Sequence, residues 1–246
     1  MKAVLRGYLT NFRLYFTFRA IWKVISFDRK TWLGCQYLYG QGLEIGALNA
    51  PLVVLPWVKV KYLDRLTVSQ LRQQYPELAS YPLSPVDILD NGETLKTLKK
   101  NSLDFLIAHH FLEHCQDPLG TMVNHLRVLK PGGILYLAIP DKNHNVDSLI
   151  PPTSLNHLIA DHQDPKHSYQ KHIYNWAYFV DKKRGQALSK HINHLININY
   201  SIHFHQWTRK ELKELLDYLQ KKKHLPFVTK EFIFNQKEYL LILKKL

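Results

Sequence analysis

Two acidic residues and a glycine stand where two neighbouring apolar runs end, between residues 41 and 64. The first run ends in Glu44-Ile45-Gly46 and the second, after a turn, ends in Asp64. A glycine at a tight turn lets a ligand approach the backbone closely, and a carboxylate at the end of the next strand suits the vicinal hydroxyls of a ribose. This arrangement predicts a site for a nucleotide-type cofactor. On these residues alone, a strand and turn with a purely structural role is the alternative.

Histidine is concentrated in one part of the chain, because nine of the fourteen histidines fall between His144 and His205. The spacing does not favour a metal site. His157 and His162 are five residues apart, which is off the i, i+4 register of a helical pair, and no cysteine accompanies them. We therefore expect no metal ion. His203 and His205 alternate, so they would face the same side of an extended segment. Core or surface positions are the favoured interpretation of these histidines, with an active-site role as the alternative.

The elements that would position these residues alternate along the chain. Asp117-Pro118 suits the start of a helix, and Thr208 with Glu211 makes a capping box for another. The repeated strand–helix order predicts a doubly wound α/β fold with a mostly parallel sheet and helices on both faces. The expected strands are residues 42–45, 59–63, 86–89, 103–108, 134–139 and a C-terminal hairpin of 227–235 and 239–244, and a helix is expected over 66–78.

Several of these segments together resemble the class I S-adenosylmethionine-dependent methyltransferases, of the methyltransferase type 11 kind. The resemblance rests on Glu44-Ile45-Gly46, on Asp64, on Asp87, and on the segment LDFLIAHHFLEHCQDPLGTMVNHLRVLKPGGILYLAIP at 103–140. It is strong over residues 40–140, whereas the tail matches by topology only. It implies a Rossmann-like sheet of seven mostly parallel strands and S-adenosylmethionine as cofactor.

The resemblance also implies roles for the matching positions. Glu44 and Gly46 would lie along the amino-acid moiety of the cofactor, Asp64 would hold the ribose hydroxyls, Asp87 would flank the adenine, and His109 would lie near the sulfonium. The implied cofactor-binding set is Glu44, Ile45, Gly46, Ala47, Asp64, Asp87, Ile88, Ala108 and His109. Glu113 and His114 are expected to fix the loop that follows.

The first turn departs from the usual E-x-G-x-G-x-G pattern of this family. Leu48 and Ala50 stand where later glycines are usual. Leucine does not readily adopt a positive φ, so we expect the turn to follow a different path, with Asn49 as the left-handed residue.

The N-terminal part of the chain is basic and aromatic. The 246 residues carry a formal charge of +13, and residues 1–30 hold seven Lys or Arg against Asp28 alone. Apolar and aromatic side chains recur there every three or four residues, which predicts one or two amphipathic helices. We expect residues 1–40 to form an extension that packs on a methyltransferase domain of residues 41–246, with peripheral membrane contact through residues 1–30 as the alternative.

The chain offers few signs of export and one sign of an added substrate element. Two cysteines do not suggest a disulfide framework, and no targeting or membrane-spanning segment is evident, so a cytoplasmic location is expected. The stretch 141–200 is too long for a simple connection and has its own apolar segments. We expect it to be a helical insertion on the substrate side of the site.

The predicted reaction moves a methyl group from sulfonium to a nucleophile, largely through proximity and orientation. A small-molecule or glycan-type acceptor, methylated at a hydroxyl, is favoured because nothing in the insertion resembles an RNA-binding module. If a general base exists, His109 is best placed, followed by His144 and His205. RNA methylation is the rival interpretation, supported by the charge and by the aromatic residues among Arg and Lys at 8–32. A non-catalytic partner protein with this fold is the third.

Overall fold

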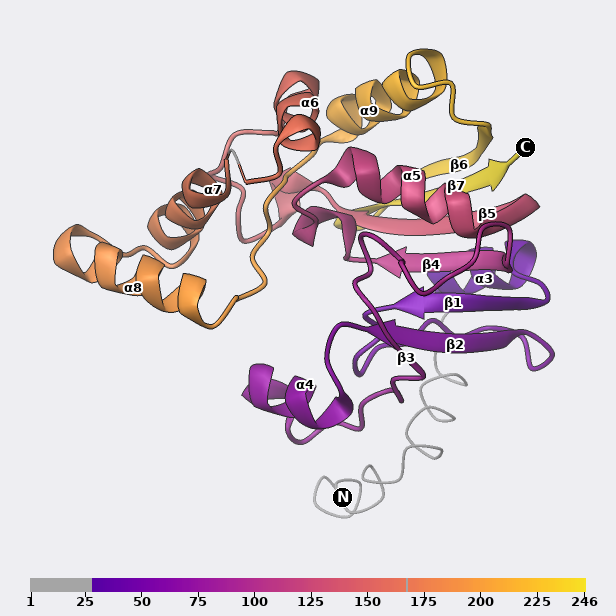
Figure 1. Cartoon of the computed structure of the whole chain (residues 1–246), viewed down its shortest axis with the longest axis horizontal. Helices are drawn as coiled ribbons and strands as arrows, with labels where there is room; N and C mark the ends of the chain where they lie inside the picture. The colour runs from indigo at the N-terminus through magenta and orange to yellow at the C-terminus, as the bar shows by residue number, and fades with distance from the viewer. Residues whose placement is uncertain (1–27, 167) are drawn as a thin grey trace.

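A seven-stranded sheet organises the chain in the computed structural model, which describes residues 28–166 and 168–246. Its order is β3-β2-β1-β4-β5-β7-β6, and β7 runs opposite to the other six strands, so that its pairings with β5 and β6 are antiparallel and the remaining pairings are parallel (Figure 1). The predicted doubly wound, seven-stranded fold is confirmed. The strands are β1 (Gln41–Ile45), β2 (Lys59–Asp64), β3 (Ile88–Leu89), β4 (Leu103–His109), β5 (Leu129–Pro140), β6 (Phe227–Asn235) and β7 (Glu238–Lys245).

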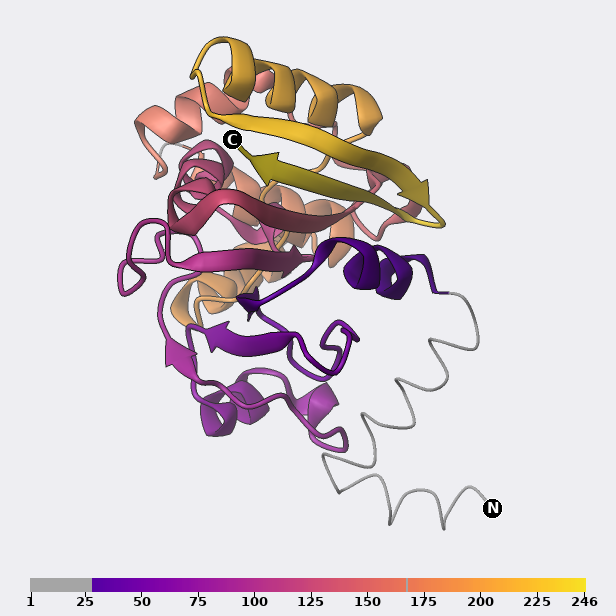
Figure 2. The same ribbon diagram turned by 90° about the vertical axis from the view of Figure 1, so that its right-hand side faces the viewer.

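Helices cover both faces of this sheet, with α3 on one face and α5 on the other (Figure 2). The described α-helices are α3 (Arg29–Tyr37), α4 (Val68–Gln74), α5 (Pro118–Val128), α6 (Leu155–Gln163), α7 (Tyr169–Asn175), α8 (Gly185–Asn197) and α9 (Arg209–Lys221). Short 3-10 turns occupy Pro76–Leu78, Leu112–His114 and Lys142–His144, and a π-helical turn occupies Trp176–Val180. The predicted amphipathic helices before residue 28 lie outside the described residues.

The central strand β4 explains why the sheet is buried on both sides. Phe105 and Ile107 pack into the core that α3 covers, whereas Leu106 and Ala108 pack into the opposite core, together with Leu126 of α5. All four of these β4 side chains are fully buried. Alternating side chains therefore supply two separate cores, as expected of a strand in the middle of a parallel sheet.

Local sequence signals set several helix ends. The Asp117 side chain accepts from Gly120 N–H at 2.8 Å, so it caps α5 as predicted. The capping box of Thr208 and Glu211 at α9 is confirmed as well. The predicted helix over residues 66–78 was too long. It ends at Gln74, and Pro76 opens a separate 3-10 turn, because the residue before a proline is driven out of the helical region.

Residues 141–200 contain α6, α7 and α8, on the side of the sheet toward which β1, β2 and β4 point (Figure 1). Ile173, Ala177 and Leu195 of this segment form a small core together with Ile202 and Phe204, which follow it. Just after the segment, the N–H groups of Phe204 and His205 donate to the backbone oxygen of Glu113, in the 3-10 turn that follows β4, at 2.7 and 3.2 Å. No helix among the described residues is long and apolar enough to span a membrane.

The outer edge of the sheet is formed by β6. Its pairing with β7 shifts register between Thr229 and Glu231. Arginines from both faces reach backbone oxygens of this strand. Arg209 of α9 donates to Phe232 O at 3.1 Å, and Arg29 of α3 donates to Phe234 O at 3.5 Å.

Candidate active site

A cavity of about 470 Å³ lies beyond the carboxyl ends of β1 and β2. Open α/β sheets bind ligands at this edge, and the volume is within the roughly 300–1,000 Å³ typical of small-molecule sites. The cavity is lined by loops after the strands, by residues of the inserted segment, mostly near its end, and by residues just after it. The lining residues used below are Gly46, Leu48, Asp64, Asn91, Gly92, Glu93, His110, Phe111, His114, Trp176, Asn199, Tyr200, Ser201, His203 and Phe204.

The first turn opens its backbone to this cavity. Gly46 has φ +63°, and a Cβ built on it would meet no atom within 4 Å. Leu48 itself has φ 46°, so the expectation that Asn49 would be the left-handed residue was wrong. The strained turn is held by Ser84, whose N–H donates to Leu48 O at 2.6 Å. The glycine pattern is therefore changed while the open backbone at Gly46 is kept.

Glu44 supports the turn from inside the protein. Its side chain is buried, and both carboxylate oxygens accept from Leu52 N–H, at 2.9 and 3.1 Å. Glu44 does not line the cavity, whereas its neighbours Ile45 and Gly46 do. The structure thus places Glu44 as the anchor of the loop on which Gly46 stands, and Ala47 is a buried part of the same loop.

Asp64 is the last residue of β2 and its side chain lines the cavity. One carboxylate oxygen accepts from Leu66 N–H at 3.1 Å, which orients the group at the strand end. Burial raises the pKa of Asp64, against the opposing effect of the backbone hydrogen bonds. A carboxylate acceptor at this point suits a pair of ribose hydroxyls.

The structure places Asp87 and Ile88 differently from the predicted adenine contacts. Asp87 is exposed, lies outside the cavity wall, and accepts from Tyr62 N–H at 2.8 Å along the sheet edge. Ile88 belongs to β3 and also does not line the cavity. Asn91, Gly92 and Glu93 reach it instead. These three follow the strand, and the turn-forming sequence Asp90-Asn91-Gly92 was the signal that could have found them.

The end of β4 presents His110 to the cavity in place of the predicted Ala108 and His109. Ala108 is buried beside Ile45 of β1, and the His109 ring packs edge-on against Tyr136 with ring centres 4.5 Å apart. The backbone turns at His110, which has φ 49°. Its ring then lies 2.8 Å from Glu238 and 3.4 Å from Glu113.

Two carboxylates control the charge of His110. Partial desolvation acts to lower the pKa of this imidazole, but hydrogen bonds to Glu113 and Glu238 outweigh it and raise the pKa to about 9. The pKa of Glu238 falls to about 2, because His110 and Lys30 outweigh the opposing effect of burial. His110 is therefore a cation at neutral pH and is not a general base there.

The three histidines predicted as bases are not brought together. His109 packs against Tyr136 and does not line the cavity, His144 pairs with Asp141 at 2.6 Å outside the cavity wall, and His205 is fully buried 2.9 Å from Asp161.

Other histidines reach the cavity instead. His114 is bound to Ile202 O at 2.8 Å and fixes its loop, and His203 lies 2.9 Å from the buried carboxylate of Asp147. The His114 and His203 rings meet edge-on, with centres 4.7 Å apart. From the sequence, a core or surface position was favoured for His203, and an active-site role was the alternative.

Comparison with known families adds the deciding observation. Residues 62–137 match the model of a methyltransferase domain, and they include most of the cavity-lining loops on the sheet. The chain carries a class I methyltransferase domain. The enzyme is therefore S-adenosylmethionine-dependent, and the non-catalytic interpretation is set aside. Comparison with curated proteins finds no match.

Solved structures resemble the methyltransferase in fold. A Rhodobacter sphaeroides protein, provisionally described as a zinc-dependent alcohol dehydrogenase, is 12% identical with a TM-score of 0.53, over 89% of this chain and 90% of that one. A methyltransferase from Aquifex aeolicus is 12% identical with a TM-score of 0.45, over 84% and 82%. The plantazolicin methyltransferase BpumL in complex with SAH is 11% identical with a TM-score of 0.48, over 93% and 84%. At these identities the likeness concerns the fold alone.

The cavity of the methyltransferase fits its cofactor. The backbone at Gly46 faces open space that a Cβ would fill, and the carboxylate of Asp64 stands one strand away. When bound there, S-adenosylmethionine supplies an electrophilic methyl group. The protein then has to hold an acceptor against that group and exclude water.

Proposed function

We propose that this methyltransferase acts on a hydroxyl group of a small-molecule or glycan-type acceptor. The observation that carries this proposal is the pair of His203 and Asp147. His203 lines the cavity, and its Nδ1 lies 2.9 Å from a carboxylate oxygen of Asp147, which is buried. A carboxylate that accepts from Nδ1–H fixes the tautomer in which Nε2 can take a proton. A hydroxyl acceptor needs such a base, because it is a weak nucleophile until its proton is removed.

The wall around His203 supports an acceptor of modest size. Trp176, Tyr200 and Phe204 give aromatic surfaces, and Asn199 and Ser201 give polar groups, all facing the cavity that the cofactor loops share. Small-molecule sites combine apolar walls with a few polar groups in this way. A concave wall of this kind favours a single acceptor group that enters the cavity over a long nucleic acid that lies along the surface.

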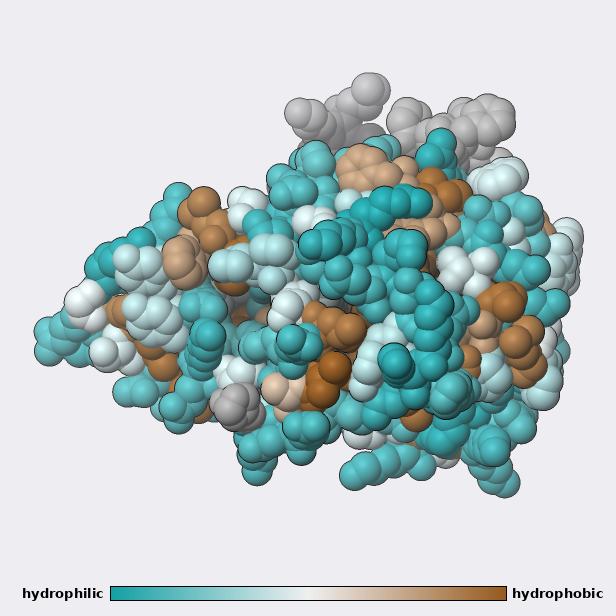
Figure 3. Space-filling view, turned by 90° about the horizontal axis from the view of Figure 1, so that it is seen from above, coloured by the Kyte–Doolittle hydropathy of each residue, from teal (hydrophilic) through white to brown (hydrophobic). Residues whose placement is uncertain are grey.

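The visible surface offers no competing extended apolar face. In the view of Figure 3 it is mostly hydrophilic, with apolar side chains in several separate patches. Charge alone still leaves RNA as the rival acceptor, and peripheral membrane contact through residues 1–30 stays a proposal from the sequence. The two free cysteines, Cys35 and Cys115, support the proposal of a reducing, cytoplasmic setting.

The acceptor class is tested by methyl transfer from labelled S-adenosylmethionine to a panel of free sugars, oligosaccharides, small amines and total RNA. We expect label in hydroxyl-bearing small molecules or glycans, as an ether that resists mild base. Label found only in RNA, or only on nitrogen, would contradict the proposal.

The base is tested with Asp147→Asn once an acceptor is found. An amide at this position no longer fixes the His203 tautomer, so we expect turnover at saturating cofactor to fall by about a hundredfold or more. Cofactor affinity should change little. The matched control is Asp141→Asn, because Asp141 is an equally buried carboxylate that pairs with His144 away from the cavity. Full turnover in Asp147→Asn would remove His203 as the base.

A further inference from the structure

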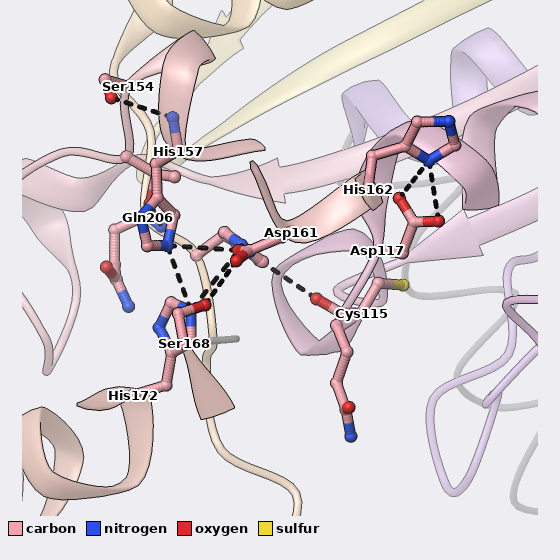
Figure 4. Close-up of polar contacts among 12 residues, drawn as sticks. Cys115, Asp117, Ser154, His157, Asp161, His162, Ser168, His172 and Gln206 are labelled. Atoms are coloured by element: carbon pink, nitrogen blue, oxygen red, sulfur yellow. Dashed lines mark hydrogen bonds and ion pairs between the residues drawn. The ribbon is translucent and has the colours of Figure 1, made fainter. Parts of the chain in front are cut away.

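Four side chains converge at a point outside the cofactor cavity. His157 and Asp161 lie one turn apart on α6, His172 lies on α7, and His205 lies in the segment before α9. The ligand-type atoms of all four lie within 4.8 Å of one another. Figure 4 shows His157 and His172 pointing toward Asp161. None of the four lines the cofactor cavity.

Four of the separations between these atoms match the edges of a small coordination tetrahedron. The Nε2 atoms of His157 and His172 are 3.2 Å apart. The Oδ2 atom of Asp161 is 3.2 Å from His157 Nε2, 3.6 Å from His172 Nε2 and 2.9 Å from His205 Nε2. Zinc bonds of about 2.0–2.1 Å to nitrogen and oxygen give tetrahedral edges of about 3.3–3.4 Å. The observed distances bracket this value.

Hydrogen bonds from all three imidazoles to Asp161 would leave two conflicts in this cluster. If each imidazole donated to Asp161, the Nε2 atoms of His157 and His172 would both carry protons and would face each other donor to donor at 3.2 Å. His205 would also become a buried cation, because its Nδ1 already faces the backbone oxygen of Cys115 at 3.0 Å and must donate to it. A metal ion removes both conflicts, since it binds the lone pairs of all four atoms.

The surroundings orient the four groups as supporting partners of a metal site do. The Cys115 oxygen fixes the His205 tautomer with Nε2 unprotonated. The Ser168 hydroxyl bonds the other carboxylate oxygen of Asp161, which directs Oδ2 inward, and lies 3.0 Å from His172 Nε2. The side chains of His205 and Asp161 are 0% and 1% exposed, and those of His172 and His157 are 11% and 29% exposed.

We propose that His157, Asp161, His172 and His205 bind one Zn²⁺ ion in a structural site. Four protein ligands complete a tetrahedron and leave no open position for substrate, which is the pattern of structural zinc rather than catalytic zinc. The ion joins α6 and α7 to the segment that carries His203, and so it fixes the inserted segment against the sheet. This proposal is independent of the methyl acceptor, because no ligand touches the cofactor cavity.

The test uses the full-length protein without a metal-binding tag. Metal analysis should find about one zinc per chain, and the metal-free protein should bind added Zn²⁺ at one site. Added Co²⁺ should give the intense visible bands of a tetrahedral ion. His157→Asn and His172→Asn should each lower Zn²⁺ affinity at least about a hundredfold, beyond the roughly 10–100-fold typical for loss of a supporting partner. Ser168→Ala removes such a partner and should weaken Zn²⁺ within that range.

The matched controls are His162→Asn, on the same helix but paired with Asp117, and His191→Asn, on α8 and paired with Asp181. Both should bind Zn²⁺ like the wild type. The proposal is overturned if folded wild-type protein neither contains zinc nor takes up Zn²⁺ or Co²⁺. It is overturned equally if His157→Asn and His172→Asn stay folded and bind Zn²⁺ at wild-type strength, because the ion would then lie elsewhere.

Discussion

Asp64 and Asp87 show how far individual residues can be predicted from the sequence. Asp64 ends one apolar run and Asp87 lies near the start of another, and both were expected to contact the cofactor. Asp64 ends a regular strand, so its place at the carboxyl edge follows directly from the pattern. The strand near Asp87 is only Ile88–Leu89, which is shorter than predicted and starts later. The residues that reach the cavity therefore come after Leu89. Strand pairing, rather than local composition, decides that boundary.

Substituting Asp64 and Asp87 in turn tests which of them binds the cofactor. Asp64→Asn should weaken S-adenosylmethionine binding by about 1–3 kcal/mol, because it removes a charged acceptor from the cavity wall. Asp87→Asn is the matched control and should leave affinity nearly unchanged, since Asp87 bonds the backbone of Tyr62 away from the cavity. Titration calorimetry measures both. Equal losses in the two variants would place Asp87 at the adenine after all.

The adjacent histidines His109 and His110 could not be told apart from the sequence. Either could have faced the cofactor, and the choice depends on the left-handed backbone at His110, with φ 49°. Left-handed residues other than glycine give little local signal, and Leu48 is a second example in the same site. At both places tertiary packing overrides residue preference.

At the scale of elements, a chain of charges joins parts of the fold that are distant in sequence. Lys30 of α3 lies 2.7 Å from Glu238 at the start of β7, and Glu238 lies 2.8 Å from His110 after β4. Glu113 in the next 3-10 turn completes the chain at 3.4 Å from His110. This network joins α3, the start of the antiparallel strand β7 and the turn after β4 at one end of the sheet.

The network predicts how stability depends on pH. The pKa of His110 is about 9 in the folded protein, above its ordinary value of 6.5. Its contribution is therefore complete below pH 6.5 and is lost as the pH rises through 9. We expect the free energy of unfolding of the wild type to fall relative to His110→Gln over this interval. Urea unfolding at pH 6, 8 and 9.5 measures the difference, with exposed His224→Gln as control. A constant difference between the two proteins would refute the shifted pKa.

The four-residue cluster around Asp161 shows a second limit of prediction from the sequence, at the scale of elements. The search for metal ligands paired His157 with His162, whereas the true helical neighbour at i+4 is Asp161. That pair could have been found by counting carboxylates as ligands. His172 and His205 could not have been assigned, because they arrive from a different helix and from an extended segment through tertiary packing alone.

At the scale of the whole molecule, the cofactor loops and the inserted segment share one cavity. Gly46 and Asp64 come from the sheet side, whereas Tyr200 and His203 come from the other side. Arg65 also donates across this boundary to Asn199 O at 3.5 Å. Binding of S-adenosylmethionine to the sheet side should therefore also order the opposite wall of the cavity.

Hydrogen exchange tests this coupling. S-adenosylmethionine should slow amide exchange in peptides covering 45–50 and 91–93 and also in 199–204, because ordering one wall restricts opening of the other. Peptides of 227–235, on the far edge of the sheet, are the internal control and should keep their rate. Protection limited to the sheet loops would show that the two walls act separately.

The arginines on the outermost strand bear on how the protein behaves at high concentration. An exposed strand edge is a template on which another chain can add a strand. Here Arg209 and Arg29 occupy backbone oxygens of β6 from opposite faces, and the register shift beside Lys230 interrupts the regular ladder. A newcomer strand would have to displace both guanidinium groups and match an irregular edge. We therefore expect this edge to resist pairing with a second copy of the chain. The two arginines responsible, Arg29 and Arg209, lie 180 residues apart in the sequence.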